Sequence, residues 1–183
     1  MRKEPTQEYL KECFDYVDGE LIWKVRPREH FDSDRSWKRC NNMYSGKLAG
    51  CKHYDINVDG YHYKIGINGT QYLRSRLTFI YNNGAIPEGL QIDHISGDTE
   101  NDHIRNLRAV NQQVNLYNKK RYKSNSSGVA GVHWDEAGKR WRAQANINGK
   151  VKRIYSGPDF FEAVCARKSW ESKNPNITSR HGK

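Results

Sequence analysis

Apolar and polar residues alternate in many short runs along the chain, and this period of two predicts a protein rich in short β-strands. Several runs are separated by Asp-Gly or Asn-Gly pairs, at residues 59–60, 68–69 and 148–149, which are typical of tight hairpin turns. We predict strands at residues 20–24, 53–58, 61–67, 70–74, 90–94, 106–110, 129–134, 139–147 and 150–155.

Four segments carry helical patterns instead. Thr6 can cap a helix over residues 6–16, and Asn111 can cap one that runs through Tyr117. Residues 76–81 predict a helix that ends near Gly84, and residues 160–173 predict an amphipathic helix. The polar stretch 27–45 has no clear period, and we predict a loop there.

The order of these elements predicts an α+β fold, in which a β-rich N-terminal and central unit precedes a small three-stranded antiparallel sheet followed by one helix. We divide the chain at turns and changes of composition. The segments are 1–45 (helix, hairpin and polar loop), 46–122 (the central unit), 123–127 (a basic and polar linker) and 128–183 (the C-terminal module with its tail).

The net charge of +10 favours a polyanionic partner, and it is concentrated in one part of the chain. Residues 119–153 contain ten lysines or arginines against two acidic residues. The first thirty residues are close to neutral, with six basic and seven acidic residues. We therefore expect a local basic surface just after the central unit.

The four cysteines, at positions 13, 40, 51 and 165, form no C-x-x-C pair, so we expect no structural zinc. Scattered cysteines in a chain without a signal peptide suggest free thiols in a reducing compartment, and no apolar run is long enough to cross a membrane. The expected location is therefore the cytoplasm.

Residues 92–118 combine side chains suited to phosphodiester hydrolysis, which needs an activated water and a neutralised phosphate. A histidine with its ordinary pKa of about 6.5 can accept a proton from water at neutral pH, and His94 is the candidate base. The oxygens of Asp93 and Asn115 suit a hard cation such as Mg²⁺. Asn106 is placed to orient His94. Each residue alone could equally cap a helix or stabilise a turn.

Taken together, the DH pair, the GD…ND turn and the NLR sequence resemble the HNH, or ββα-metal, nuclease motif. Asn106 follows His94 by twelve residues, and Asn115 follows Asn106 by nine. The resemblance implies a homing endonuclease of phage type, with His94 as the base, Asp93 and Asn115 as ligands of Mg²⁺ or Mn²⁺, and Asn106 fixing the loop and the histidine. The motif often ends in His where this chain has Asn115, and relatives usually have Arg at the position of His103.

The C-terminal module resembles the APETALA-type DNA-binding domain, through Gly131-Val132, Trp134, the string 139–143, Gly157 and Phe161. The resemblance implies that the sheet lies in the major groove of double-stranded DNA. Side chains alternate along the strand predicted at 139–147, so Arg140 and Arg142 lie on the opposite face of the sheet from Trp141. Trp141 then either packs in the core or contacts DNA.

The basic surface and this module together supply the candidate DNA-binding residues. They are Lys119, Lys120, Arg121, Lys123, His133, Trp134, Lys139, Arg140, Trp141, Arg142, Gln144, Lys150, Lys152 and Arg153. The alternative is a charged, solvated sheet face. The loop at 27–45 is either a solvated linker or an arm that contacts DNA.

The hypothesis that follows is a sequence-preferring DNA endonuclease that uses one divalent cation and acts as a homing endonuclease or a nickase. The alternative is a DNA-binding regulator that has kept an HNH scaffold without cleavage, and a third candidate binds or cleaves RNA. The sequence leaves open the target site, a nick or a double-strand cut, and a monomer or a homodimer.

Overall fold

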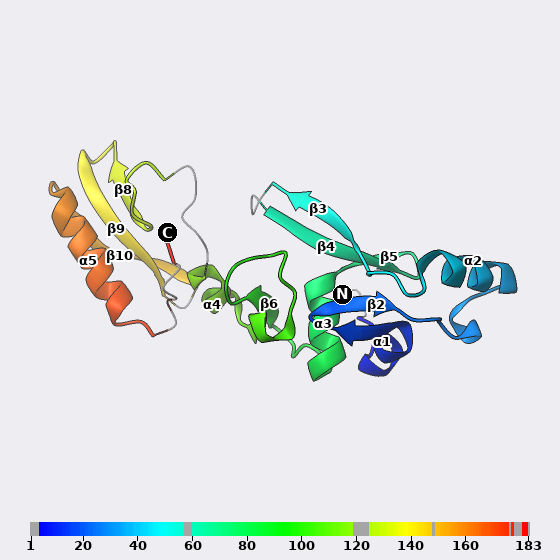
Figure 1. Cartoon of the computed structure of the whole chain (residues 1–183). Helices are drawn as coiled ribbons and strands as arrows, with labels where there is room; N and C mark the ends of the chain where they lie inside the picture. The colour runs from blue at the N-terminus through cyan, green and yellow to red at the C-terminus, as the bar shows by residue number, and fades with distance from the viewer. Residues whose placement is uncertain are drawn as a thin grey trace. The chain divides into compact units, whose positions relative to one another are not determined.

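The computed structural model describes residues 4–56, 60–118, 125–147, 149–175, 177 and 181–182 (Figure 1). The chain divides into two compact units, Met1–Val110 and Asn111–Lys183. Both units mix helices with small antiparallel sheets, which confirms the predicted α+β class. No helix among the described residues has the length and apolar character needed to cross a bilayer.

The first unit begins with helix α1 (Gln7–Cys13), and the Thr6 side chain accepts a hydrogen bond from the Tyr9 amide as predicted. The predicted end of this helix was wrong, because the chain turns into strand β1 (Phe14–Val17) immediately after Cys13. β1 pairs with β2 (Glu20–Trp23) through a turn at Asp18-Gly19, where both φ angles are positive. Pairing Phe14 with Trp23 buries both rings, which outweighs the helical period.

The predicted loop at 27–45 was also wrong. It contains a 3-10 turn, η1 (Arg28–His30), and helix α2 (Asp34–Tyr44), which Ser33 caps by accepting a hydrogen bond from the Ser36 amide. Trp37, Cys40 and Tyr44 lie at helical spacing, but the segment is polar overall and no residue of α2 is buried, so its composition resembles that of a loop.

The central part of the first unit's sequence forms a three-stranded sheet, in the order β3 (Cys51–Asp55), β4 (Gly60–Ile67) and β5 (Thr70–Leu73). The Asn68-Gly69 turn is confirmed, with φ values of 48° and 75°. Residues 57–58 of the strand predicted at 53–58, and Asp59 of the predicted Asp-Gly turn, lie outside the described residues.

Helix α3 (Arg74–Asn83) follows the sheet and ends at Gly84, in agreement with the prediction. Its Leu77 and Ile80 pack into one core with residues from α1, β1, β2 and β4. The central members of this core are Leu10, Cys13, Phe14, Leu21, Trp23, Ile65 and Ile67. Burial raises the pKa of the Cys13 thiol, and all four cysteines are free.

The last hairpin of this unit joins β6 (Gln91–His94) to β7 (Leu107–Val110). The intervening loop, residues 95–106, ends in the 3-10 turn η2 (Ile104–Asn106). Helix α4 (Gln112–Tyr117) comes next, and the Asn111 side chain accepts a hydrogen bond from the Val114 amide as predicted. α4 already belongs to the second unit.

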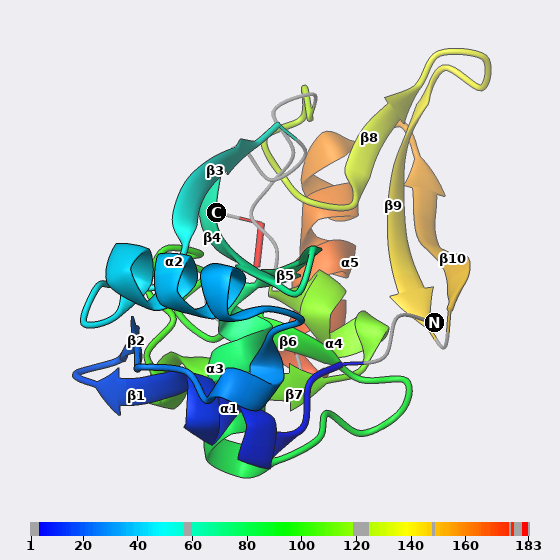
Figure 2. The ribbon, with the colours of Figure 1, turned by 90° about the vertical axis from the view of Figure 1, so that its right-hand side faces the viewer.

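The second unit contains the predicted three strands and one helix. The sheet order is β10 (Lys150–Gly157), β9 (Arg140–Ile147) and β8 (Val132–Asp135), and α5 (Phe160–Ser172) packs on one face (Figure 2). Val132, Ala143 and Ala163 form the core. The Arg167 guanidinium is buried, and it donates to the Gln144 carbonyl over 2.5 Å.

Candidate active site

Asp93 and His94 are the last two residues of β6, and both pair with β7: Asp93 lies opposite Arg108 and His94 opposite Leu107. The strand continues through His94, so the two side chains alternate across it. Asp93 is buried, and its Oδ2 accepts hydrogen bonds from Arg108 Nε at 3.0 Å and Nη2 at 2.8 Å. Arg108 therefore compensates the buried charge of Asp93.

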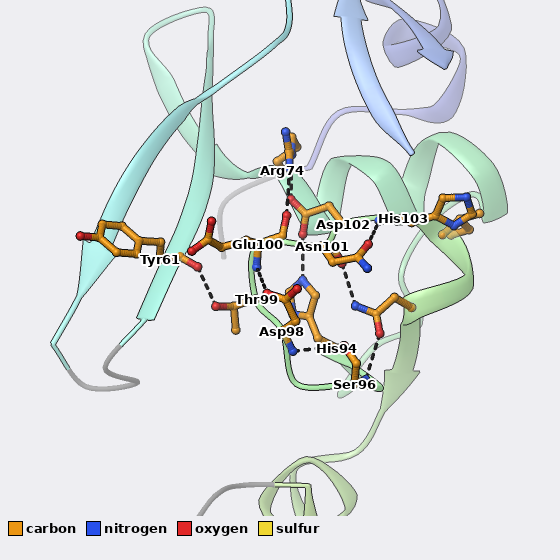
Figure 3. Close-up of polar contacts among 12 residues, drawn as sticks. Tyr61, Arg74, His94, Ser96, Asp98, Thr99, Glu100, Asn101, Asp102 and His103 are labelled. Carbon is orange, nitrogen blue, oxygen red and sulfur yellow. Dashed lines mark hydrogen bonds and ion pairs between the residues drawn. The ribbon is translucent and has the colours of Figure 1, made fainter. Parts of the chain in front are cut away.

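A buried carboxylate that the sequence analysis did not single out holds the imidazole of His94. His94 Nε2 lies 2.8 Å from Asp102 Oδ1, and Arg74 Nε donates to Asp102 Oδ2, also over 2.8 Å (Figure 3). The side chains of Asp102 and Arg74 are 2% and 1% exposed. His94 is thus the outer end of a buried chain of polar contacts.

Arg74 is held by further partners from three parts of the unit. Its guanidinium pairs with Glu20, donates to the Glu100 carbonyl and lies over the ring of Tyr63, 3.8 Å from its centroid. A cation with this many contacts is fixed in one position. Arg74 therefore fixes Asp102, and Asp102 fixes the ring of His94.

The contact to Asp102 also determines which ring nitrogen of His94 can act as a base. A carboxylate accepts hydrogen bonds, so the neutral imidazole carries its proton on Nε2 and its basic lone pair on Nδ1. Asp102 is the second residue of the Asn101-Asp102 pair, which the sequence analysis considered only as part of a turn. No local pattern distinguishes a buried aspartate from one that stabilises a turn.

Asn106 was predicted to orient His94 and the loop, and its side chain joins the two sides of the loop. Its Oδ1 accepts from the Ser96 amide at 2.9 Å, and its Nδ2 donates to the Asn101 carbonyl over 2.8 Å. The Asn106 carbonyl also accepts from the Ile95 amide. Asn106 therefore closes the loop that carries Asp102.

Two contacts tie this loop to the central sheet. Thr99 Oγ1 donates to the Tyr61 carbonyl over 2.6 Å (Figure 3). Lys52 Nζ lies 2.7 Å from a Glu100 carboxylate oxygen. The hydrogen bond with Glu100 raises the pKa of Lys52. His103 occupies the position where relatives of the motif usually have Arg. Its Nδ1 accepts a hydrogen bond from the Arg105 amide, and His103 caps the η2 turn.

Asn115, the second predicted metal ligand, lies on α4 in the second unit, one turn after Asn111. The structure thus gathers His94, Asn106 and Asp102 around one loop and places Asp93 beside them on β6. Among the described residues, no three His, Cys, Asp or Glu side chains form a cluster that could hold a metal. The carboxylate of Asp93 and the amide oxygen of Asn115 are nevertheless the oxygen donors that a hard divalent cation prefers.

In the second unit, strand register separates the candidate DNA-binding residues into two faces. Val132 pairs with Ala143 in the core, and Trp134 pairs with Trp141 on the same face. Trp141 packs against Phe160 with ring centroids 4.6 Å apart, so of the two alternatives it occupies the core side. The opposite face carries His133, Arg140, Arg142, Gln144 and Arg153.

An aspartate lies among these cations. Asp135 Oδ2 is 2.6 Å from Arg142 Nη2 and 3.4 Å from Arg140 Nε. Desolvation raises the pKa of Asp135, but the Gly138 amide and the two guanidinium groups outweigh it and hold that pKa below its usual value. Each arginine is therefore already partly neutralised.

The other candidates are distributed around this sheet. Lys139 pairs with Glu136, which also accepts from Trp134 Nε1. Lys150 and Lys152 are exposed on β10, where Lys152 pairs with Ala145 and so shares its face. Lys119, Lys120, Arg121 and Lys123 lie outside the described residues.

Comparison with known proteins agrees with the motif. The family model of HNH endonucleases matches residues 72–117, which include β6, the loop and β7. Protein 3.8 of Escherichia phage T7 is 40% identical over 82 residues, which cover 45% of this chain and 67% of that protein. DNA endonuclease I-HmuI of Bacillus phage SP01 is 35% identical over 80 residues, covering 42% of this chain and 45% of that endonuclease.

No solved structure matches the chain. The family model covers the candidate site and leaves the C-terminal module unmatched, so the APETALA-type resemblance stays a prediction. The length shared with the T7 protein and the match of the motif lead to one conclusion: the chain carries an HNH endonuclease domain and belongs to the same family as Protein 3.8 of phage T7.

Proposed function

We propose that the protein is a DNA endonuclease that hydrolyses one phosphodiester bond with the help of one divalent cation, Mg²⁺ or Mn²⁺. The observation that carries this proposal is the contact of His94 Nε2 with the buried Asp102, inside the segment that matches the HNH family. This contact gives the candidate base a defined orientation and tautomer. The name of the related I-HmuI, a DNA endonuclease, supports DNA as the substrate.

In the proposed reaction, His94 Nδ1 accepts a proton from the water that attacks the phosphorus, while Nε2–H stays bonded to Asp102. Asp102 stabilises the resulting imidazolium, and Arg74 holds Asp102 in place through its hydrogen bond to Oδ2. Asn106 holds the loop, so that the distance between His94 and Asp102 is maintained. Asp93 and Asn115 would hold the cation, which when bound supplies charge neutralisation at the phosphate and at the leaving 3′ oxygen.

The second unit is proposed to bind double-stranded DNA through the face of its sheet that carries Arg140, Arg142 and Gln144. Its charge supports this role, because the sequence of this unit has fifteen basic and five acidic residues. One catalytic motif per chain supports a nick, as expected of a homing endonuclease that acts as a nickase. Cutting both strands would require a second copy or repositioning.

The test is cleavage of supercoiled plasmid and of phage genomic DNA in Mg²⁺ or in EDTA, by wild type and by His94→Ala. The matched control is His53→Ala, which removes an exposed histidine from β3. We expect Mg²⁺-dependent nicked product from wild type and from the control, and none from His94→Ala. Equal product from all three proteins would rule out His94 as the base. DNA retention without cleavage by wild type would instead identify a regulator.

A further inference from the structure

The unit that carries His94 has no excess of positive charge. Its sequence, residues 1–110, contains sixteen lysines or arginines and sixteen aspartates or glutamates, so the net charge of +10 belongs entirely to residues 111–183. A catalytic unit without net charge gains no long-range attraction to DNA. Any DNA contact that it makes must therefore come from a local group of cations.

Six of the fourteen described lysines and arginines of this unit are paired with carboxylates. The ion pairs are Lys24–Asp15, Arg28–Asp34, Lys52–Glu100, Arg74–Asp102, Arg76–Glu4 and Arg108–Asp93. Arg35, Lys38 and Arg39 are exposed and have no ion-pair partner in the part of the chain that the structure describes. All three belong to α2, so this helix is the main concentration of uncompensated charge in the unit.

Helix α2 is held against the unit by its opposite face. Trp37 Nε1 donates to the Arg26 carbonyl over 2.9 Å, and Asn41 bonds both the amide and the carbonyl of Arg26. The ring of Tyr44 lies near that of Trp23, with centroids 6.1 Å apart. Residues 37, 41 and 44 therefore anchor one side of the helix, at intervals of about one turn.

The outer side presents Arg35, Lys38, Arg39 and Asn42, spaced three and four residues apart on one face. Like charges at these intervals destabilise an isolated helix. α2 also buries no residue, so core packing does not account for its sequence. An anionic ligand along this face would relieve the repulsion.

We infer that α2 is a second DNA-binding element, whose Arg35, Lys38 and Arg39 contact backbone phosphates of the duplex that is cleaved. The inference rests on the proposed function, because it takes the duplex as its ligand. In Figure 1, α2 lies at the opposite end of the first unit from β6, which places its contacts on DNA that flanks the scissile bond. Phosphate contacts of this kind position the duplex and carry no sequence preference.

The salt dependence of DNA affinity tests this inference. Each phosphate contact makes the affinity more salt-dependent, whatever the sequence of the DNA. The variant is Arg35→Ala/Arg39→Ala in the full chain, and the measurement is the affinity for a labelled DNA duplex over a range of salt concentrations. The control Lys11→Ala/Lys173→Ala removes the same charge from two exposed lysines that are not among the proposed DNA-binding residues. Arg35→Lys/Arg39→Lys keeps the charge.

We expect the slope of log K against log salt concentration to become shallower by about 2, and the affinity near 0.1 M salt to fall roughly 10- to 50-fold. The control and the lysine variant should stay within about twofold of wild type. Circular dichroism of each variant checks that the fold is retained.

The outcomes separate this inference from the proposed function. A slope equal to that of the control overturns the role of α2, even if wild type cleaves DNA. A reduced slope in a protein that does not cleave supports α2 and overturns the nuclease. If wild type binds no duplex DNA, or if the loss occurs only with an RNA probe, the inference is overturned as well.

Discussion

Asp102 Oδ1 lies 2.8 Å from His94 Nε2, and Oδ2 of the same carboxylate accepts from Arg74 Nε over the same distance. One buried anion therefore joins the proposed base to a buried cation. Each oxygen of the Asp102 carboxylate lies against a different N–H donor. A substitution at Asp102 that removes one acceptor oxygen therefore disturbs the contact with His94 or the contact with Arg74.

Asp102→Asn should lower kcat for plasmid nicking by about 10- to 100-fold with little effect on DNA affinity. An asparagine has one acceptor oxygen and one donor NH2 group, so it cannot accept from both His94 and Arg74. If the NH2 group faces His94, the ring must carry its proton on Nδ1, and the proposed base is lost. Single-turnover kinetics and a binding titration separate the two quantities.

The control for Asp102→Asn is Asp98→Asn, which removes an exposed carboxylate from the same loop and retains the acceptor for the Glu100 amide. It should cleave within about threefold of wild type. A similar loss in both variants would mean that loop stability, and not the contact to His94, limits the rate.

Arg74→Met should destabilise the first unit by about 3–5 kcal/mol, because it leaves the carboxylate of Asp102 buried without its cation. Adding Asp102→Leu removes that charge. The double variant should therefore lose less free energy of unfolding than the sum of the losses in Arg74→Met and Asp102→Leu. Chemical unfolding followed by the fluorescence of Trp23 reports on this unit. Additive losses would show that Arg74 and Asp102 are not coupled.

The sequence predicted the elements whose signal is local. Asn111 caps α4, Asn68-Gly69 makes its hairpin, and the alternating runs at 90–94 and 106–110 correctly predicted the strands β6 and β7. α1 was predicted too long because the pairing of Phe14 with Trp23 is a contact across a turn, which no helical period reports. α2 was missed because the segment is polar overall and none of its residues is buried.

The candidate site was predictable only in part, for a similar reason. His94 and Asp93 stand out because the motif contains them, whereas the partner that holds His94 depends on burial. Asp102 is polar and lies in a loop rich in Asp and Asn, so its sequence context suggests an exposed turn residue. Its burial depends on Arg74, which lies 28 positions away along the chain. Contacts of that separation follow from the fold and not from the spacing of the motif.

Asp93→Asn should raise the Mg²⁺ concentration required for half-maximal nicking by at least about tenfold. The substitution removes the only charge among the two proposed ligands and keeps the size of the side chain. The measurement is a titration of Mg²⁺ at saturating DNA. Because Arg108 bonds Asp93, Arg108→Gln serves as a structural control. An unchanged Mg²⁺ requirement in Asp93→Asn would exclude Asp93 as a ligand.

Asp135→Asn should increase DNA affinity about 3- to 10-fold and make the salt dependence steeper by about 1, because it releases Arg140 and Arg142 from a carboxylate. The amide oxygen can still accept the hydrogen bond from Gly138 that shapes the turn. Asp15→Asn, an exposed position of the first unit, removes the same charge as a control. Equal affinity in both variants would place the DNA on another surface.

His181 should make the second unit less stable as the pH falls below about 6.5. Burial, together with the Arg167 guanidinium 3.0 Å away, lowers the pKa of His181 in the folded protein. The unfolded chain then binds more protons than the folded one, so stability is complete above the ordinary pKa and is lost as the pH drops toward the folded value. Hydrogen exchange of the β9 amides, which Arg167 contacts through the Gln144 carbonyl, measures this loss. His181→Gln should flatten the pH dependence whereas His53→Gln should not, and a wild-type profile in His181→Gln would mean that another group titrates.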